Sequence, residues 1–166
     1  MNELGKEIVD WLRAFGQIIV APGAQTFVGL GAEAVGKWRG LVVWLVFAQM
    51  VGVLAANQIA HVRYPPSAII LSLLMAPLVG LVWSTLVHVS YQKISGRRRD
   101  RHAELTYVLG CILVIVLFAD LVAAILPTAS GVVQIVLFLY AAVLAIVAVR
   151  AVTGIRTWQS VAAVVV

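Results

Sequence analysis

Cysteine occurs once in this chain, at Cys111 within a long apolar run. A single cysteine excludes an internal disulfide and a metal cluster built on several thiolates. The chain also has no Gly-Lys-Ser/Thr phosphate loop, no His-Glu-x-x-His and no Gly-x-Ser-x-Gly. His88 has no second histidine at three- or four-residue spacing, so we expect a polar residue at headgroup level instead of a metal ligand. We therefore expect a non-enzymatic protein with no catalytic or metal site and no cofactor.

Charge is also scarce, since 11% of the residues are charged whereas 63% are hydrophobic. Soluble domains are about 45–50% apolar, and an aqueous fold would not hide this excess. The composition therefore indicates a polytopic membrane protein, and 166 residues fit one helical bundle. A net charge of +5 can indicate nucleic-acid binding, but here the basic residues border the apolar runs, so we expect no nucleic-acid partner.

The first forty residues are expected to form two short helices at the membrane surface. Apolar side chains recur every three or four residues from residue 4 to residue 19, with charged side chains on the other side, which predicts an amphipathic helix lying in the interface. This helix either braces the bundle or docks a partner protein. Pro22-Gly23 ends it, and a second short segment leads to Lys37-Trp38-Arg39, a headgroup boundary. Residues 1–40 are thus predicted to be an interfacial helix and an elbow.

Residues 41–166 are expected to form an all-α transmembrane bundle. Twenty apolar residues rise about 30 Å as a helix, which matches the hydrocarbon core of a bilayer. Pro65-Pro66 and the uncharged turn from Leu126 to Gly131 separate such runs, and Pro77 is expected to kink the second run. Gly154, between Arg150 and Arg156, is expected to stop the fourth. The sequence predicts four full spans and a short fifth helix, at residues 41–60, 67–91, 105–126, 132–149 and 157–166.

A strongly basic loop between the second and third spans determines the expected orientation. Eleven of the twelve Lys and Arg residues lie on one side of the predicted topology, and Arg63 alone lies on the other. Because cytoplasmic loops retain Lys and Arg, the N-terminus is predicted to be cytoplasmic. Asp100, within this loop, is the expected N-cap of the third span. The loop either sets topology only or also contacts anionic lipid, through Lys93, Arg97, Arg98, Arg99 and Arg101.

Asp120 is the one acidic residue within a predicted span. An intramembrane carboxylate is costly, so it is expected to be paired or to handle ions. Arg63 is the only basic residue on the outer side, and we expect a structural ion pair there, with charged ends within about 8 Å of each other. Ion transport would need further polar groups, for which Gln49, Asn57 and Gln134 are the candidates.

The second half of the chain resembles the Yip1-domain family. The resemblance is carried by the arginine- and glycine-containing loop, Glu104-Leu-Thr-Tyr-Val-Leu-Gly, the Leu126-Pro127…Gly131 turn and residues 142–162, and it is best from about residue 80 onward. It implies five spans and a cytoplasmic N-terminus. Eukaryotic members bind Rab GTPases and one another, but their tyrosine- and acid-containing N-terminal region has no counterpart here. The short loops are typical of a prokaryotic member, which implies the prokaryotic inner (plasma) membrane.

These observations predict an integral membrane scaffold or accessory subunit that packs against other membrane proteins or itself, surrounded by membrane lipids. The small-residue stripe Ala141, Ala145 and Ala148 suits close helix contact. The alternative is a transporter or channel component that uses Asp120 as its intramembrane polar site. Lipid, quinone or pigment binding stays open at this point, because an apolar pocket leaves no mark in a sequence.

Overall fold

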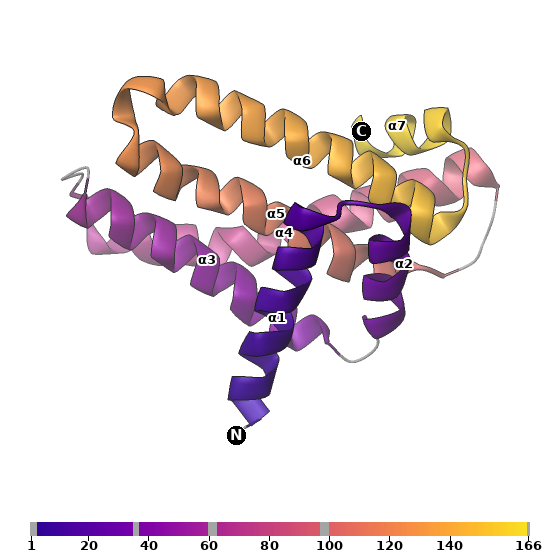
Figure 1. Ribbon diagram of the computed structural model, residues 1–166, viewed down its shortest axis with the longest axis horizontal. Helices are drawn as coiled ribbons and strands as arrows, with labels where there is room; N and C mark the ends of the chain where they lie inside the picture. The colour runs from indigo at the N-terminus through magenta and orange to yellow at the C-terminus, as the bar shows by residue number, and fades with distance from the viewer. Residues whose placement is uncertain (1–2, 35–36, 60–62, 97–99, 166) are drawn as a thin grey trace.

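The computed structural model describes residues 3–34, 37–59, 63–96 and 100–165, apart from the side chains of residues 3–4, 38–40, 119–120, 123–124, 127 and 130. Within these ranges the chain forms seven α-helices, one 3₁₀ turn (Pro127–Ala129) and no strand, which confirms the all-α class. The helices, labelled in Figure 1, are α1 (Glu3–Val20), α2 (Ala24–Glu33), α3 (Trp38–Gln58), α4 (Pro66–Ser95), α5 (His102–Ile125), α6 (Ser130–Thr153) and α7 (Thr157–Val165).

Three helices in the described part of the chain are long and apolar enough to cross a membrane. The qualifying stretches are Leu41–Gln58 in α3, Pro66–Ser95, which is all of α4, and Gly131–Thr153 in α6. In α5 the apolar stretch within the described residues is shorter, His102–Phe118. The structure thus supports a membrane-embedded protein, with three candidate spans where the sequence predicts four.

The central helix of the bundle is α5, because α1, α2, α3, α4 and α6 all contact it. Residues 105–112 are buried without a break, so this third of α5 is covered on every side. A helix that is apolar all round is expected in such an interior position. In Figure 1, α3, α5 and α6 run alongside one another as the body of the bundle.

The small-residue stripe of α6 lies inside the bundle. Ala141, Ala145 and Ala148 are at most 4% exposed and belong to the hydrophobic core. Small side chains let helix backbones approach closely, which suits the packing of α6 on α5. The helix contact that the sequence predicts for this stripe is therefore a contact within the bundle.

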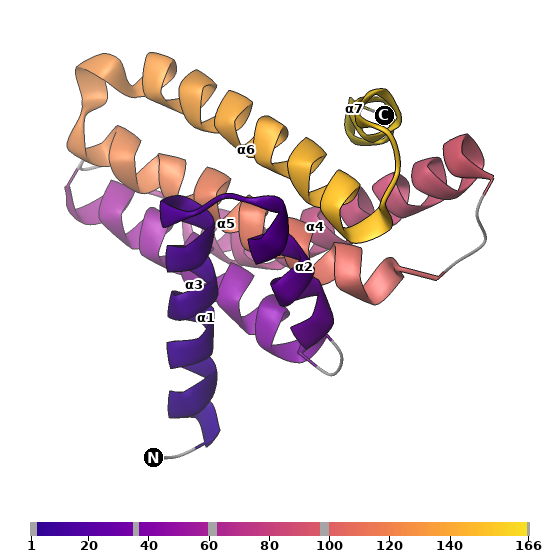
Figure 2. The same cartoon turned by 45° about the vertical axis from the view of Figure 1, so that its right-hand side comes forward.

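The amphipathic helix α1 runs across the direction of α3, α5 and α6 (Figures 1 and 2). Its aromatic side chains pack on the flank of the bundle: the ring centroid of Trp11 lies 5.8 Å from that of Trp44, and that of Phe15 lies 5.5 Å from that of Phe118. Other apolar side chains of α1, such as Leu12 at 54% exposed, are not covered. The bundle thus buries only part of the apolar face of α1, and its interfacial position stays a prediction.

Glycine ends two of the long helices. Gly154, predicted to stop α6, has φ 68° at its C-cap, and Gly96 ends α4 with φ 63°. This left-handed conformation is strained for residues with a Cβ. The prediction for the start of α5 was wrong by one residue, because Arg101, not Asp100, occupies the N-cap position. Asp100 still satisfies an end group, since its carboxylate accepts a hydrogen bond from the backbone N–H of His102 (3.0 Å).

Gly110 sets the spacing between α5 and α3. A Cβ added there would lie 2.5 to 2.9 Å from three side-chain carbons of Leu41, which is 3% exposed. Because Leu41 is confined, Gly110→Ala is expected to destabilise the protein by about 1–3 kcal/mol, as overpacked cores do. A thermal scan in detergent with a thiol-reactive dye measures this loss, because Cys111 is buried and becomes reactive on unfolding.

Gly29→Ala is the matched control, since a Cβ at Gly29 meets no atom within 4 Å. It is expected to leave the Tm unchanged or to raise it, because alanine is favoured over glycine in a helix by about 0.5–1 kcal/mol. Adding Leu41→Ala to Gly110→Ala should relieve the clash. Equal Tm values for the Gly110→Ala and Gly29→Ala proteins would contradict the role of Gly110.

Candidate functional site

The predicted ion pair falls partly outside the described side chains. Arg63 is exposed and precedes α4, while Asp120 lies on α5 but its side chain is not among those described. Figure 1 shows the C-terminal end of α3, the N-terminal end of α4 and the C-terminal end of α5 at the same end of the bundle. The contact between Asp120 and Arg63 therefore stays a prediction.

The basic loop is described at its two ends only, since Arg97, Arg98 and Arg99 lie outside the described residues. Lys93 is exposed in the last turn of α4. Arg101 forms an ion pair with Glu104, which lies in the first turn of α5. One of the predicted lipid-contact residues thus has an acidic partner in the chain, and contact of this loop with anionic lipid stays a prediction.

Polar side chains of α4 meet the beginning of α5 in a cluster next to the basic loop. The α4 members recur at three- and four-residue steps, which places them on one face of the helix. The α5 end contributes two side chains and the residue that precedes Arg101. We call this group the α4–α5 polar cluster; it consists of Ser84, Thr85, His88, Gln92, Asp100, His102 and Thr106.

Two buried hydroxyl groups join α4 and α5 within the cluster. The hydroxyl of Ser84, which is 0% exposed, donates to the carbonyl oxygen of Leu81 (3.0 Å). Its oxygen accepts a hydrogen bond from the hydroxyl of Thr106 (3.2 Å), which is itself 7% exposed. Both hydroxyls therefore have partners in an apolar environment, where an unsatisfied hydroxyl is costly.

A second contact between the two helices joins Thr85 to His102. The hydroxyl of Thr85 donates to the carbonyl oxygen of Leu81 (2.7 Å). His102 Nε2 lies 3.2 Å from the same hydroxyl oxygen, within hydrogen-bond distance.

His88 is enclosed by the cluster and is 8% exposed, and its predicted position at headgroup level stays a prediction. Its Nε2 lies 3.0 Å from the side-chain nitrogen of Gln92 and 3.7 Å from a carboxylate oxygen of Asp100. Its ring meets that of His102 edge-on, with centroids 5.2 Å apart. Among the described side chains, His88 Nδ1 is the buried polar atom without a hydrogen-bond partner.

The polar contacts of the cluster are suited to a structural role, in which they hold two helices together. The cluster combines two imidazoles with one carboxylate, yet the described residues include no group of three or more His, Cys, Asp or Glu side chains placed to hold a metal ion. Its contacts join α4 to Asp100, at the end of the basic loop, and to the start of α5. The arrangement therefore holds the two helices together beside the loop.

The cluster was missed in the sequence, although one signal for it was present. Thr85, His88 and Gln92 form a polar stripe on one face of an otherwise apolar helix. That stripe indicates a polar neighbour, but it does not say which segment supplies it. His102 and Thr106 approach it only because α5 packs against α4.

Comparison with protein-family models, curated proteins and solved structures found no match to this chain. The resemblance to the Yip1-domain family thus depends on the quoted sequence features alone.

The contact between Ser84 and Thr106 is testable by a double-mutant cycle. Ser84→Ala and Thr106→Val each remove one side of the hydrogen bond, so their destabilising effects should be less than additive. The expected coupling is about 0.6 kcal/mol, the average for hydrogen bonds between membrane helices. Unfolding by a denaturing detergent, followed through the reactivity of Cys111, gives the four free energies.

The control cycle combines Thr106→Val with Ser72→Ala. Ser72 lies on the same helix and donates only within it, to the carbonyl oxygen of Ile69 (2.9 Å). These two changes should be additive. A coupling in the Ser84 cycle no larger than in the Ser72 cycle would show that the hydroxyl pair does not hold α4 to α5.

Proposed function

We propose that the protein is a non-enzymatic integral membrane scaffold or accessory subunit of Yip1-like type, which packs against other membrane proteins. The supporting observation is the uncovered apolar face of α4. Among the described side chains, ten large apolar residues of α4 are exposed, compared with six on α6 and four on α3. A partner helix would therefore find its largest free surface on α4.

The free face of α4 is formed by large side chains that recur at three- and four-residue steps. Four that follow one line are Leu71, Leu74, Leu78 and Val82, each at least 50% exposed. Association of helices within a bilayer depends on such side-chain packing, because lipid tails are as apolar as leucine and supply no hydrophobic driving force. The α6 stripe is already used inside the bundle, so the α4 face is the surface that we assign to a partner.

The proposed topology has four full spans and a short fifth helix, with α5 as the additional span. The 24 residues of α5 rise about 36 Å, which exceeds the hydrocarbon core of about 30 Å. The nine residues of α7 are too few to cross. We place the N-terminus in the cytoplasm because of the charge asymmetry between the two ends of the bundle. The prokaryotic inner membrane is proposed from the short loops and the resemblance to the Yip1-domain family.

Cysteine accessibility tests this orientation. In a Cys111→Ser background, Tyr64→Cys and Thr157→Cys mark opposite ends of the bundle, at exposed positions and without altering any charge. A membrane-impermeant maleimide should label Tyr64→Cys in intact cells and Thr157→Cys only after permeabilisation. The reverse labelling pattern would invert the proposed topology.

The partner is sought by purification from the native membrane in mild detergent, with chemical crosslinking and mass spectrometry. One membrane protein should be recovered in stoichiometric amount with the wild-type chain. Leu78→Trp should lower this recovery at least fivefold, because a larger side chain does not fit a packed helix contact.

Leu139→Trp on α6 is the matched control, since Leu139 is 58% exposed and Leu78 is 50% exposed. Fluid lipid accommodates the larger side chain, so recovery of the partner should be unchanged. Recovery of the protein alone would contradict the scaffold function. It would lead to transport assays on reconstituted protein, with Asp120→Asn as the control.

A further inference from the structure

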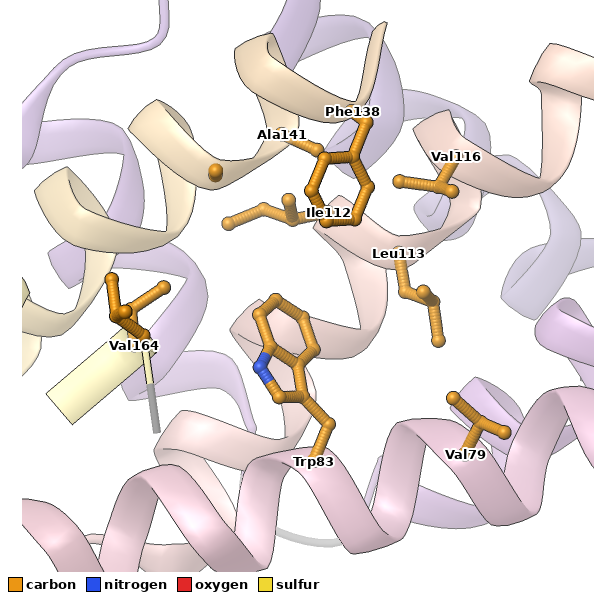
Figure 3. A pocket seen from close by; sticks show the side chains of 10 residues that line it. Val79, Trp83, Ile112, Leu113, Val116, Phe138, Ala141 and Val164 are labelled. Carbon is orange, nitrogen blue, oxygen red and sulfur yellow. The ribbon is translucent and has the colours of Figure 1, made fainter. Parts of the chain in front are cut away.

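A cavity of about 520 Å³ lies between α4, α5 and α6, at the tip of α7. Figure 3 shows its walls: Trp83 comes from α4, Ile112 and Leu113 from α5, and Phe138 from α6. Both α4 and α6 pack on α5, but they are not a packed pair with each other. The cavity is therefore a slot with α5 as its floor and α4 and α6 as its sides.

One end of the slot is closed by α7. The side-chain amide of Gln159 donates to the carbonyl oxygen of Ile94 (3.4 Å), which ties α7 to the end of α4. Val164 and Val165, at the tip of α7, line the cavity. The slot thus begins at this tip and continues between the two long helices.

The lining consists of hydrocarbon, apart from the indole nitrogen of Trp83. An apolar cavity does not hold ordered water, because water needs two to four polar partners. An empty cavity of this size would also lose the dispersion contacts of all the side chains around it. The occupant that fits this chemistry is an apolar group.

The size and the surroundings of the cavity suit a lipid chain. The slot lies between α4 and α6, two of the three candidate membrane spans, so its open side faces the bilayer in the proposed placement. A flexible chain fits a volume of this order, which is typical of pockets for small molecules (about 300–1,000 Å³). Val79 of the lining lies 13 residues, or about 20 Å, along α4 from Pro66, which is within the depth of the hydrocarbon core.

We propose that this slot binds one acyl chain of a membrane phospholipid, which fills the gap between α4 and α6 and packs on the tip of α7. The proposal depends on the membrane placement but not on any protein partner. The chain enters sideways from the bilayer, and the headgroup stays outside, since the lining offers no charged group. A chain held on three sides exchanges more slowly than lipid at the outer surface.

The test is lipid retention by the purified full-length protein, measured by native mass spectrometry and lipid extraction after extensive detergent washing. The wild-type protein should keep about one phospholipid per molecule. Ala142→Phe places a ring in the slot and should lower this amount at least fivefold. Val143→Phe is the matched control, because Val143 is the next residue of α6, is 57% exposed and does not line the slot. It should retain lipid as the wild type does.

Quenching of Trp83 fluorescence by brominated lipid is a second test, which does not require the Ala142→Phe protein to fold. The wild-type protein and Trp83→Phe are reconstituted in vesicles of phosphatidylcholine with brominated chains, redissolved in excess detergent and purified. The emission of Trp83, obtained as the difference between the two proteins, should remain quenched by a retained chain.

Three results would overturn the acyl-chain assignment: equal lipid retention by Ala142→Phe and Val143→Phe, full recovery of Trp83 emission in detergent, or a bound quinone in place of phospholipid. A missing protein partner would leave the lipid result unaffected. The two proposals therefore fail separately.

Discussion

The close packing of helices on α5 is the constraint on which the rest of the structure depends. In a bilayer, helices associate through van der Waals contact, and that contact requires close approach of their surfaces. Gly110 on α5 admits Leu41 of α3, and Gly80 on α4 would bring an added Cβ within 3.1 Å of Leu113 on α5. A Cβ added to Gly31 on α2 would instead make only ordinary contacts, 3.5 Å from Val152 of α6 and 3.8 Å from Glu104 of α5. Missing side chains at two positions thus bring α3 and α4 close to one central helix.

This central position of α5 explains the other features of the bundle. Since α4 and α6 pack on different sides of α5, a gap remains between them, and the proposed lipid site lies in that gap. Since α4 has α5 on only one side, much of its surface stays uncovered, and that surface carries the proposed partner contact. The polar cluster lies where α4 and the start of α5 meet beside the basic loop, at the point where the apolar spans end.

Much of the fold follows from local patterns in the sequence. Hydropathy located the long helices to within a few residues, because a run of apolar residues and its Pro, Gly or charged ends are local properties. Gly154 ended α6 as predicted, for the same reason. The arrangement of the helices in space is not predicted in this way, since the long helices are apolar over most of their surface and the polar stripe of α4 does not say which helix it meets. Nothing local shows that α5 is central or that the alanine stripe of α6 is buried within the chain.

The candidate site was less predictable than the fold, and the reason is sequence separation. His88 has no second histidine one turn away, and its ring neighbour, His102, comes from the other side of the basic loop. Such a pair depends on the position of α5 along the axis of α4. The glycine contacts and the Ser84–Thr106 hydrogen bond determine that position. The apolar slot is still less predictable from the sequence, because it depends on the positions of α4, α5, α6 and α7 together.

The slot-facing side and the uncovered face of α4 lie next to each other on the same helix. Val79 and Trp83 face the slot, whereas Leu78 and Val82, one residue before each, belong to the uncovered face. A rotation of α4 about its axis would therefore change both surfaces together. The Ser84–Thr106 hydrogen bond and the contact of Gln159 with the end of α4 oppose such a rotation from two sides. An acyl chain in the slot would oppose it from within the bilayer. On the proposed function, the lipid would thus help to define the helix face that a partner protein meets.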